Sequence, residues 1–355
     1  MKLTISTTRL QALLNKAVKG AGSNKLIPMT SLIAIKLKDG VLTLTTTDAT
    51  NYLSLIEKDI SGDEFYVAVQ VDLLAKLVSR MTCDEVILEV VDSVLNVIGN
   101  GKYQIELDAE DDGSLVKLPN PIEKFKKDTK IGTTDSQVVL RTLSSIKPAL
   151  ATTMDYPWFT CYYVGKDITA TDTYTVANNQ EGFLKKPKLI SSTVMDLLGL
   201  FSGTIDIYLD GDKMLFEAES GVVYGIVPNG IENYSIDAIS GLVNQDFDYS
   251  CSVSKSSLLS LLDRISLFVG TYDNGNITLS FGKDGLDVTS KYANEKIAYI
   301  NSDNSGEFTC KTDVYTLATH VKAQTGSEIT IVYGDDNALK LIDGDITSVI
   351  ALLEE

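Results

Sequence analysis

The segment Lys38-Asp-Gly-Val-Leu-Thr-Leu-Thr-Thr-Thr-Asp-Ala-Thr-Asn-Tyr-Leu53 combines a tight turn with a strand pattern. Asp39 and Gly40 form a dipeptide typical of a β-turn, and apolar residues then alternate with threonines toward Asp48. An Asp-Gly turn followed by such alternation predicts a β-hairpin with one buried face. The segment therefore indicates an antiparallel sheet near the start of the chain.

Related segments occur twice more at nearly constant spacing. Gly165–Ala177 contains a polar turn, alternation and a Thr-Asp pair ending at Asp172, whereas Lys283–Ala293 has Thr-Ser, ending at Ser290. Asp48 and Asp172 are 124 residues apart, and Asp172 and Ser290 are 118 apart. A period of about 120 residues suits one small domain and is too long for a solenoid repeat. We therefore predict three tandem copies of one fold, at 1–124, 125–244 and 245–355.

Length and composition agree with a multidomain globular protein. The chain has 355 residues, of which 44% are hydrophobic, so it can bury a large core. No apolar run approaches the roughly 20 residues that a membrane span needs. Met1–Ile5 leads into alternation and not into the apolar block of a signal peptide. We therefore expect a soluble cytoplasmic protein with no membrane partner.

The sequence holds no pattern that predicts an enzyme, a metal site or a cofactor. Cys83, Cys161, Cys251 and Cys310 are far apart and form no Cys-x-x-Cys pair, and His320 is the single histidine. Reduced, buried thiols are therefore expected in place of zinc ligands or disulfides. The chain also contains no phosphate-binding glycine-rich loop and no Gly-x-Ser-x-Gly motif.

Asp48, Asp172 and His320 each allow a catalytic and a structural interpretation. Asp48 and Asp172 could act as paired carboxylates, but both follow a threonine in a repeated hairpin, which favours hydrogen bonds within a turn. His320 lies in a predicted helix close to Lys322. We expect it on the polar face of that helix and not as a general base.

Six segments have the apolar periodicity of amphipathic helices, two in each copy. They cover residues 7–19, 71–81, 135–147, 191–201, 254–268 and 311–324. In each copy the order is a helix, hairpin strands, a second helix and further strands. This order predicts an α+β fold in which two helices pack on an antiparallel sheet.

The net charge of −17 argues against a nucleic-acid partner, since phosphate binding depends on Lys and Arg. The helices differ from the rest of the chain. With the third and sixth windows widened to 135–150 and 310–325, they contain eleven Lys or Arg and five Asp or Glu. Lysine-rich outer faces are common on surface helices, so one interpretation is a solvated surface. The other is that all the helices face one polyanion.

These residues together resemble a known family. Leu26-Ile-Pro28, the segment Lys38–Asp48, the Thr-Asp pair at 171–172 and the threefold order of helices and strands resemble the bacterial sliding clamp, the beta subunit of DNA polymerase III. The resemblance covers nearly the whole chain. It implies three similar domains that form half of a ring, head-to-tail closure by two chains, and helices that line a hole for duplex DNA.

The resemblance also implies a function without catalysis. A sliding clamp is a processivity factor that tethers the replicative polymerase and other replication and repair proteins to DNA, in the cytoplasm at the nucleoid, with no cofactor. The alternative is a repeat-built interaction protein that does not bind DNA. An adhesin at the cell surface is disfavoured by the missing export signal.

Two departures from the family pattern concern binding sites. Asn24, with Lys25 beside it, stands where the family has an arginine, and the chain ends in Ala351-Leu-Leu-Glu-Glu355 where the family has Met-Pro-Met-Arg-Leu. The first affects one DNA contact and the second the specificity of partner binding. The divergence leaves open a clamp of a phage or mobile element.

Three functional surfaces follow from the resemblance. Duplex DNA, bound without sequence preference, would be contacted by Lys16, Lys19, Lys25, Lys76, Arg80, Arg141, Lys147, Lys255, Arg264, Lys311 and Lys322. The homodimer interface would join Tyr103 and Ile105 of one chain to Leu267 and Phe268 of the other.

The third surface is a pocket for short peptide motifs of the polymerase III catalytic subunit and the clamp loader. It would consist of Thr171, Thr173, Tyr174, Thr175, Val176, Tyr315, Val349, Ala351 and Leu353. Val, Leu and Tyr side chains with Thr hydroxyls can bury an apolar peptide and orient its backbone. The simpler interpretation is that Val176, Val349 and Leu353 only seal a domain junction.

Overall fold

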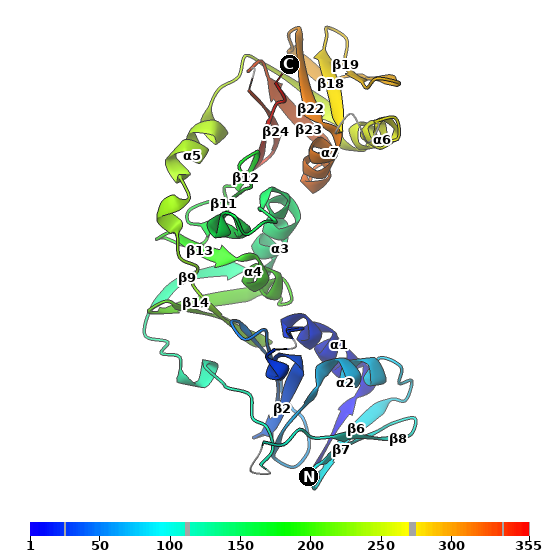
Figure 1. Ribbon diagram of the computed structural model, residues 1–355, viewed down its shortest axis with the longest axis vertical. Helices are drawn as coiled ribbons and strands as arrows, with labels where there is room; N and C mark the ends of the chain where they lie inside the picture. Colours follow the sequence, from blue (N-terminus) through cyan, green and yellow to red (C-terminus); the bar gives the residue numbers. More distant parts are fainter. Residues whose placement is uncertain (25, 111–113, 270–274, 336, 355) are drawn as a thin grey trace. The chain divides into compact units, whose positions relative to one another are not determined.

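The computed structural model describes residues 1–24, 26–110, 114–269, 275–335 and 337–354. The chain forms two compact units (Figure 1). Unit 1 comprises Met1–Val139 and Thr193–Val227, and unit 2 comprises Leu140–Ser192 and Pro228–Glu355. In the described part of the chain, no helix has both the length and the apolar character that crossing a membrane requires.

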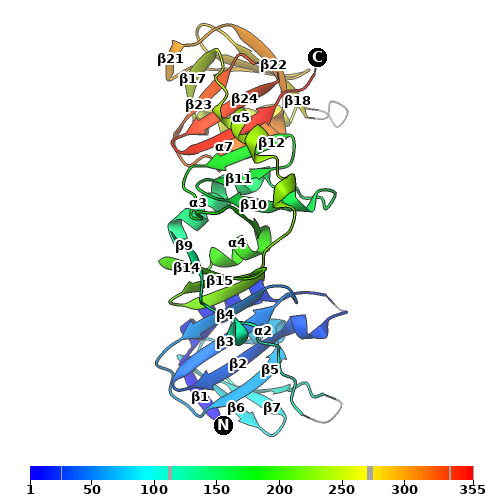
Figure 2. The ribbon, with the colours of Figure 1, turned by 90° about the vertical axis from the view of Figure 1, so that its left-hand side faces the viewer.

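Unit 1 contains two antiparallel sheets. The four-stranded sheet has the order β1-β6-β7-β8, and the eight-stranded sheet has the order β5-β2-β3-β4-β16-β15-β14-β9. The strands are β1 (Lys2–Ser6), β2 (Leu32–Lys38), β3 (Val41–Thr47), β4 (Tyr52–Glu57), β5 (Phe65–Gln70), β6 (Glu85–Val91), β7 (Val94–Ile98), β8 (Lys102–Glu106), β9 (Lys130–Asp135), β14 (Thr204–Asp210), β15 (Lys213–Ala218) and β16 (Gly221–Ile226). The second view shows the broad face of the larger sheet (Figure 2).

The hairpin predicted from the opening segment is formed by β2 and β3, in which Lys38 pairs with Val41. Asp39 and Gly40 have φ angles of 51° and 73°. Positive φ at both central residues is the requirement of a two-residue hairpin turn of the type that Asp-Gly favours. The prediction is confirmed, and the alternation that follows places Leu42 and Leu44 in the core.

The helices of unit 1 are α1 (Thr7–Ala17), α2 (Val71–Val78) and most of α4 (Ser192–Leu198). α1 and α2 pack side by side, and their apolar stripes are buried. Ser6 is the N-cap residue of α1 and makes no side-chain capping bond, and β1 continues directly into the helix, whose first residue is Thr7.

Unit 2 also contains two antiparallel sheets. Their orders are β13-β10-β11-β12-β25-β24-β23-β17-β21 and β20-β19-β18-β22. The strands are β10 (Cys161–Val164), β11 (Ile168–Thr171), β12 (Thr175–Asn179), β13 (Lys188–Ser191), β17 (Tyr249–Ser254), β18 (Asn276–Phe281), β19 (Leu286–Thr289), β20 (Asn294–Ile297), β21 (Asn301–Asn304), β22 (Phe308–Asp313), β23 (Glu328–Tyr333), β24 (Ala338–Asp343) and β25 (Ile346–Ala351).

The helices of unit 2 are α6 (Lys255–Ser266), α7 (Val314–Ala323), α5 (Ile236–Asn244) and most of α3 (Ser136–Ser145). α6 and α7 pack side by side, as α1 and α2 do in unit 1. α5 lies in the polar stretch 229–248, outside the six helical segments expected from the sequence. It packs on the sheet through Ile239, which is buried, with Ile236 and Val243 partly buried beside it.

The residues of the predicted second copy contribute to both large sheets. β9 and β14 to β16 complete the eight-stranded sheet, whereas β10 to β13 complete the nine-stranded one. Each large sheet is therefore continuous across a predicted domain boundary. The division into three domains at 1–124, 125–244 and 245–355 stays a prediction.

Candidate functional site

The two Thr-Asp pairs form nearly identical turns. Asp48 Oδ1 accepts hydrogen bonds from the backbone N–H groups of Thr50 (2.8 Å) and Asn51 (2.7 Å), and Thr47 Oγ1 donates to the Asn51 carbonyl at 2.7 Å. Ala49, between them, has a φ of 84°. The Asp48 carboxylate is thus used inside its own turn.

The second turn repeats this pattern. Asp172 Oδ1 accepts from the N–H groups of Tyr174 (3.0 Å) and Thr175 (2.7 Å), Thr171 Oγ1 donates to the Thr175 carbonyl at 2.7 Å, and Thr173 has a φ of 81°. These bonds are those of Asx turns, which satisfy backbone donors locally. The geometry agrees with the structural role that the sequence favoured over paired catalytic carboxylates.

Each turn leads into a strand that joins two parts of a large sheet. In unit 1, β4 pairs with β16, and Tyr52 lies opposite Tyr224. Their rings meet edge to face with centroids 5.8 Å apart. In unit 2, β12 pairs with β25, and Val176 lies opposite Val349. We call these pairings the β4–β16 junction and the β12–β25 junction.

The residues predicted for the peptide pocket meet at the β12–β25 junction, but they differ in exposure. Val176 and Val349 are buried, so they seal the junction. Tyr174 lies in the turn, and 75% of its surface is exposed. Its backbone carbonyl accepts a hydrogen bond from the Ala351 N–H at 3.0 Å. α7 packs on β25 and presents Tyr315, which is 57% exposed.

The remaining pocket residues divide in the same way. Thr171 and Thr175 are buried, whereas Thr173 and Ala351 are exposed. Leu353 is 38% exposed, and its N–H donates to the Lys311 carbonyl at 2.9 Å, which ties the C-terminal segment to β22. The accessible part of this surface is therefore Thr173, Tyr174, Tyr315, Ala351 and Leu353.

The prediction for His320 is wrong. The residue is 1% exposed and lies inside unit 2, not on a polar face. Burial lowers the pKa of its imidazole to about 4, although the nearby Asp172 carboxylate acts in the opposite direction. Gln324 Nε2 donates to the His320 carbonyl (3.2 Å) and to Ser348 Oγ (3.1 Å), so a buried polar group connects α7 to β25.

The basic residues predicted to contact DNA fall into two groups. Several are held by neighbours: Lys76 pairs with Asp72 at 3.5 Å, Arg141 pairs with Glu181 at 2.9 Å, Arg264 pairs with Glu295, and Lys255 donates to the Gln324 carbonyl. In the residues described, Lys16, Lys19, Arg80 and Lys322 have no ion pair. Lys147 is exposed, Lys311 is half-buried, and Lys25 lies outside the described residues.

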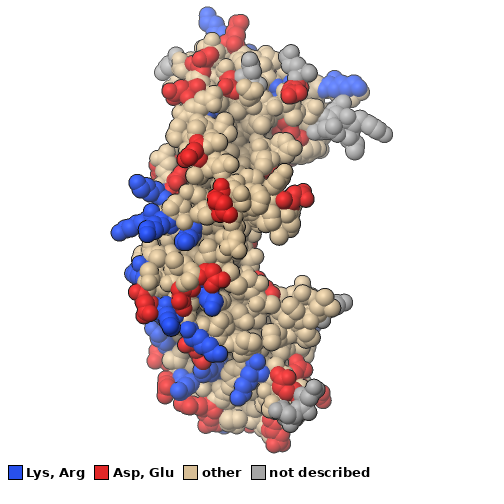
Figure 3. Space-filling view, turned by 60° about the vertical axis from the view of Figure 1, so that its left-hand side comes forward, with Lys and Arg blue, Asp and Glu red and all other residues tan. Residues whose placement is uncertain are grey.

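The partners of these cations could not be read from the sequence. Glu181 and Glu295 are 40 and 31 residues from the arginines that they bind. Both arginines therefore carry less free charge than a count of basic residues suggests. Figure 3 shows acidic and basic side chains interspersed over one face of the molecule.

The residues predicted for the dimer lie on two edges. Leu267 and Phe268, at the end of α6, are 79% and 52% exposed, and Tyr103 on β8 is 43% exposed. Ile105 is only 5% exposed, since its side chain packs within unit 1. β8 and β20 end their sheets, because each has a single neighbouring strand among the described residues.

Residues 1–115 match the family described as DNA polymerase III beta subunit, N-terminal domain. A search of curated protein sequences finds no match. Among solved structures, the DNA polymerase sliding clamp of Bacillus subtilis is 18% identical, with a TM-score of 0.83 over 100% of this chain and 99% of that chain.

Two further structures are similar over 100% of both chains. The DNA polymerase III beta chain of Streptococcus pneumoniae is 15% identical with a TM-score of 0.84, and a Bartonella birtlesii sliding clamp bound to griselimycin is 14% identical with a TM-score of 0.83. These relatives are clamps and clamp subunits, which confirms the resemblance and the fold class predicted from the sequence. The match of residues 1–115 to this family and the similarity of these solved structures together show that the whole chain has the fold of the bacterial sliding clamps.

Proposed function

We propose that this protein is a sliding clamp that encircles duplex DNA and tethers the polymerase III catalytic subunit and other replication and repair proteins. The observation that carries the proposal is the clamp fold over the full length of the chain. As such a factor it would act in the cytoplasm at the nucleoid and would catalyse no reaction itself.

The exposed cations on the helices support a loose, sequence-independent contact with DNA. Lys16, Lys19 and Arg80 come from α1, its 3₁₀ extension and the turn after α2, which are neighbouring segments of unit 1. Contacts to phosphate alone carry no base information. The ion pairs of Arg141 and Arg264 reduce the free positive charge, which favours sliding over tight binding.

Retention on circular and linear DNA tests this function. After loading by a bacterial clamp loader, the protein should remain on nicked circular DNA through gel filtration and should leave linear DNA by sliding off its ends. Direct binding without loading should be weak and should fall as salt rises. Equal retention on both forms, or retention on neither, would contradict a ring and favour an interaction protein that does not bind DNA.

The two internal junctions predict how a head-to-tail dimer closes. In both, the residue four positions after the turn aspartate, Tyr52 or Val176, pairs with the fourth residue of the outer strand, Tyr224 or Val349. The third copy has Asn294 four positions after Ser290 on the open edge strand β20, and the fourth residue of the open strand β8 is Ile105.

We therefore infer that β8 of one chain pairs with β20 of a second copy in the same register. Ile105 would lie opposite Asn294, and Tyr103 opposite Lys296 of the second copy. Leu267 and Phe268, which the single chain leaves exposed, would be covered beside this third junction.

Leu267→Asp should convert the dimer to a monomer in sedimentation velocity, because it would bury a carboxylate without a partner. The exposed position means that the substitution should leave the fold of the single chain intact. Ile105→Asp is a poorer test, since Ile105 is already buried in the single chain. Leu242→Asp, at an exposed leucine of α5 that belongs to neither edge strand, is a control for the surface charge. A Leu267→Asp variant that stays dimeric would rule out this interface.

We also propose that the exposed strip of Thr173, Tyr174, Tyr315, Ala351 and Leu353 binds short peptides of the polymerase and the loader. Exposed aromatic side chains beside an exposed leucine can hold an apolar peptide. Glu354 adds negative charge next to the strip, so a peptide with a basic flank should bind best. Tyr174→Ala should weaken binding of a polymerase-tail peptide about tenfold in fluorescence anisotropy. Unchanged affinity in this variant and in one lacking residues 351–355 would place the pocket elsewhere.

A further inference from the structure

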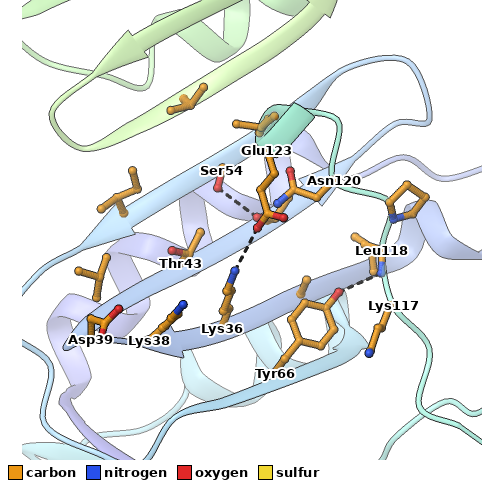
Figure 4. A pocket seen from close by; sticks show the side chains of 17 residues that line it. Lys36, Lys38, Asp39, Thr43, Ser54, Tyr66, Lys117, Leu118, Asn120 and Glu123 are labelled. Carbon is orange, nitrogen blue, oxygen red and sulfur yellow. Dashed lines mark hydrogen bonds and ion pairs between the residues drawn. The ribbon is translucent and has the colours of Figure 1, made fainter. Parts of the chain in front are cut away.

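Unit 1 contains a cavity that none of the surfaces described so far uses. It has a volume of about 700 Å³ and lies between the outer face of β2 and β3 and the segment 117–123, which crosses over them (Figure 4). Small side chains on the sheet, among them Ala34, Thr43 and Ser54, leave the space open. Its size is within the range of small-molecule sites in proteins.

The walls of the cavity combine an apolar floor with positive charge. Ile56, Ile122 and Val222 supply apolar surface, and Lys36, Lys38 and Lys117 supply ammonium groups. Lys36 Nζ binds Glu123 Oε1 at 3.0 Å, while Lys38 and Lys117 have no ion pair among the described residues. Asp39 and Glu123 are the acidic side chains of the lining, so lysines outnumber acids in a chain of net charge −17.

Two polar groups give the cavity a hydrogen-bonding capacity as well. The Tyr66 hydroxyl oxygen accepts the Leu118 N–H at 2.9 Å, which leaves its own proton available to donate. Asn120 Oδ1 is buried and has no hydrogen-bond partner among the described residues. Because buried acceptors are normally satisfied, this oxygen indicates a place for a donor group.

We propose that this cavity binds a small amphipathic anion, with an apolar body on the sheet face, its anionic group near Lys38 and Lys117, and a donor N–H or O–H directed at Asn120. The site is independent of DNA, of the dimer edges and of the peptide strip. Its residues come from β2, β3, β4, β5, β16 and the segment 117–123, all within unit 1.

The probe for this site is anilinonaphthalene sulfonate, which carries a sulfonate, aromatic rings and one N–H donor and becomes fluorescent when it is bound. Fluorescence titration of the full chain should give saturable binding. Thr43→Trp fills the floor of the cavity from β3, and a Lys38→Glu, Lys117→Glu double variant reverses the two ammoniums. Each should weaken binding by about tenfold or more, by blocking the space or removing the attraction.

A control for surface charge is Lys213→Glu, which reverses one exposed lysine of β15 that does not line the cavity. It should leave affinity within about twofold. N-phenylnaphthylamine, which has the same rings without the sulfonate, should bind much more weakly than the anionic dye.

Several outcomes would overturn the proposal. Wild-type affinity in both cavity variants would place the dye elsewhere, and an equal loss in Lys213→Glu would reduce the effect to overall charge. Equal binding of the neutral analogue would exclude selection for an anion. Displacement of the dye by a Glu-rich decapeptide at lower concentration than by unlabelled naphthalene sulfonate would assign the site to an acidic peptide. Thermal unfolding of each variant shows that a loss of binding is not a loss of fold.

Discussion

The β4–β16 and β12–β25 junctions have the same backbone register but different side chains. At the first, Tyr52 and Tyr224 meet edge to face, and Phe125 packs against Tyr224 with centroids 6.3 Å apart. At the second, Val176 lies opposite Val349, and a buried hydrogen bond joins Gln324, at the end of α7, to Ser348 of β25. The two junctions share main-chain pairing and an Asx turn, whereas their side chains differ.

The difference is also visible at the surface. The Asp48 turn exposes Ala49 and Thr50, whereas the Asp172 turn exposes Thr173 and Tyr174. Only at the second turn does the described structure include a hydrogen bond from a C-terminal residue, Ala351, to the turn. The peptide strip proposed at the second junction would use large exposed side chains such as Tyr174, whereas the first turn exposes only small ones.

The buried polar group should make the second junction sensitive to acid. The folded-state pKa of His320 is about 4, below the ordinary value of 6.5. Between these values the unfolded chain binds a proton that the folded chain does not. The stability that depends on His320 being neutral is therefore fully present above pH 6.5. As the pH falls toward 4, the unfolding free energy decreases by about 3 kcal/mol through this one group.

Urea denaturation at several pH values measures this effect. His320→Leu should flatten the fall in unfolding free energy between pH 6.5 and 4.5, and the chain has no other histidine to complicate the comparison. Carboxylates that titrate near pH 4 are present in both proteins and cancel in the difference. An unchanged slope would mean that His320 does not remain neutral on folding.

The two turns should be equally important for folding despite their different surfaces. Asp48→Ala and Asp172→Ala each remove an acceptor of two backbone N–H groups and should each lower the unfolding free energy by about 1–3 kcal/mol. Asp48→Asn and Asp172→Asn retain Oδ1 and should cost much less. A large loss at one turn only, measured by chemical denaturation, would show that the repeated motif has different roles in the two units.

The features shared by the junctions were the ones that the sequence could predict. The Asp-Gly turn, the Thr-Asp pairs and the helical stripes are local patterns whose physics depends on neighbours within a few residues. The core helices therefore lie close to where they were predicted, and the β2–β3 hairpin is confirmed.

The features that differ depend on contacts between distant segments. His320 follows Leu317 by three positions, so it borders the buried stripe of α7, but only the packing of β25 closes the space around it. The ion pairs of Arg141 and Arg264 join residues from separate elements. α5 is not among the predicted helices because the Gly, Asn and Asp residues around it are typical of loops, although Ile236, Ile239 and Val243 have helical spacing.

The smallest expected effect concerns the affinity of the dimer at the proposed third junction, between two chains. If β8 pairs with β20 of a second copy in the register of the internal junctions, Tyr103 lies opposite Lys296. Tyr103→Lys would then place like charges face to face and Tyr103→Glu opposite charges, each changing pair energy by a fraction of a kcal/mol to about 1 kcal/mol. The dimer dissociation constants of the two variants should differ by about tenfold in sedimentation equilibrium.

Reversing the charge of Lys296, the residue opposite Tyr103, gives the decisive test. In a Lys296→Glu background the order should invert, so that Tyr103→Lys forms the tighter dimer, because only directly opposed residues exchange their preference in this way. Lys296 Nζ also lies 3.7 Å from Asp287 Oδ2 of its own chain. The loss of this exposed ion pair affects all the Lys296→Glu variants equally. If the order of affinities does not invert, then β8 and β20 either pair in another register or do not pair at all. The register of the two internal junctions would then not apply to the contact between two chains.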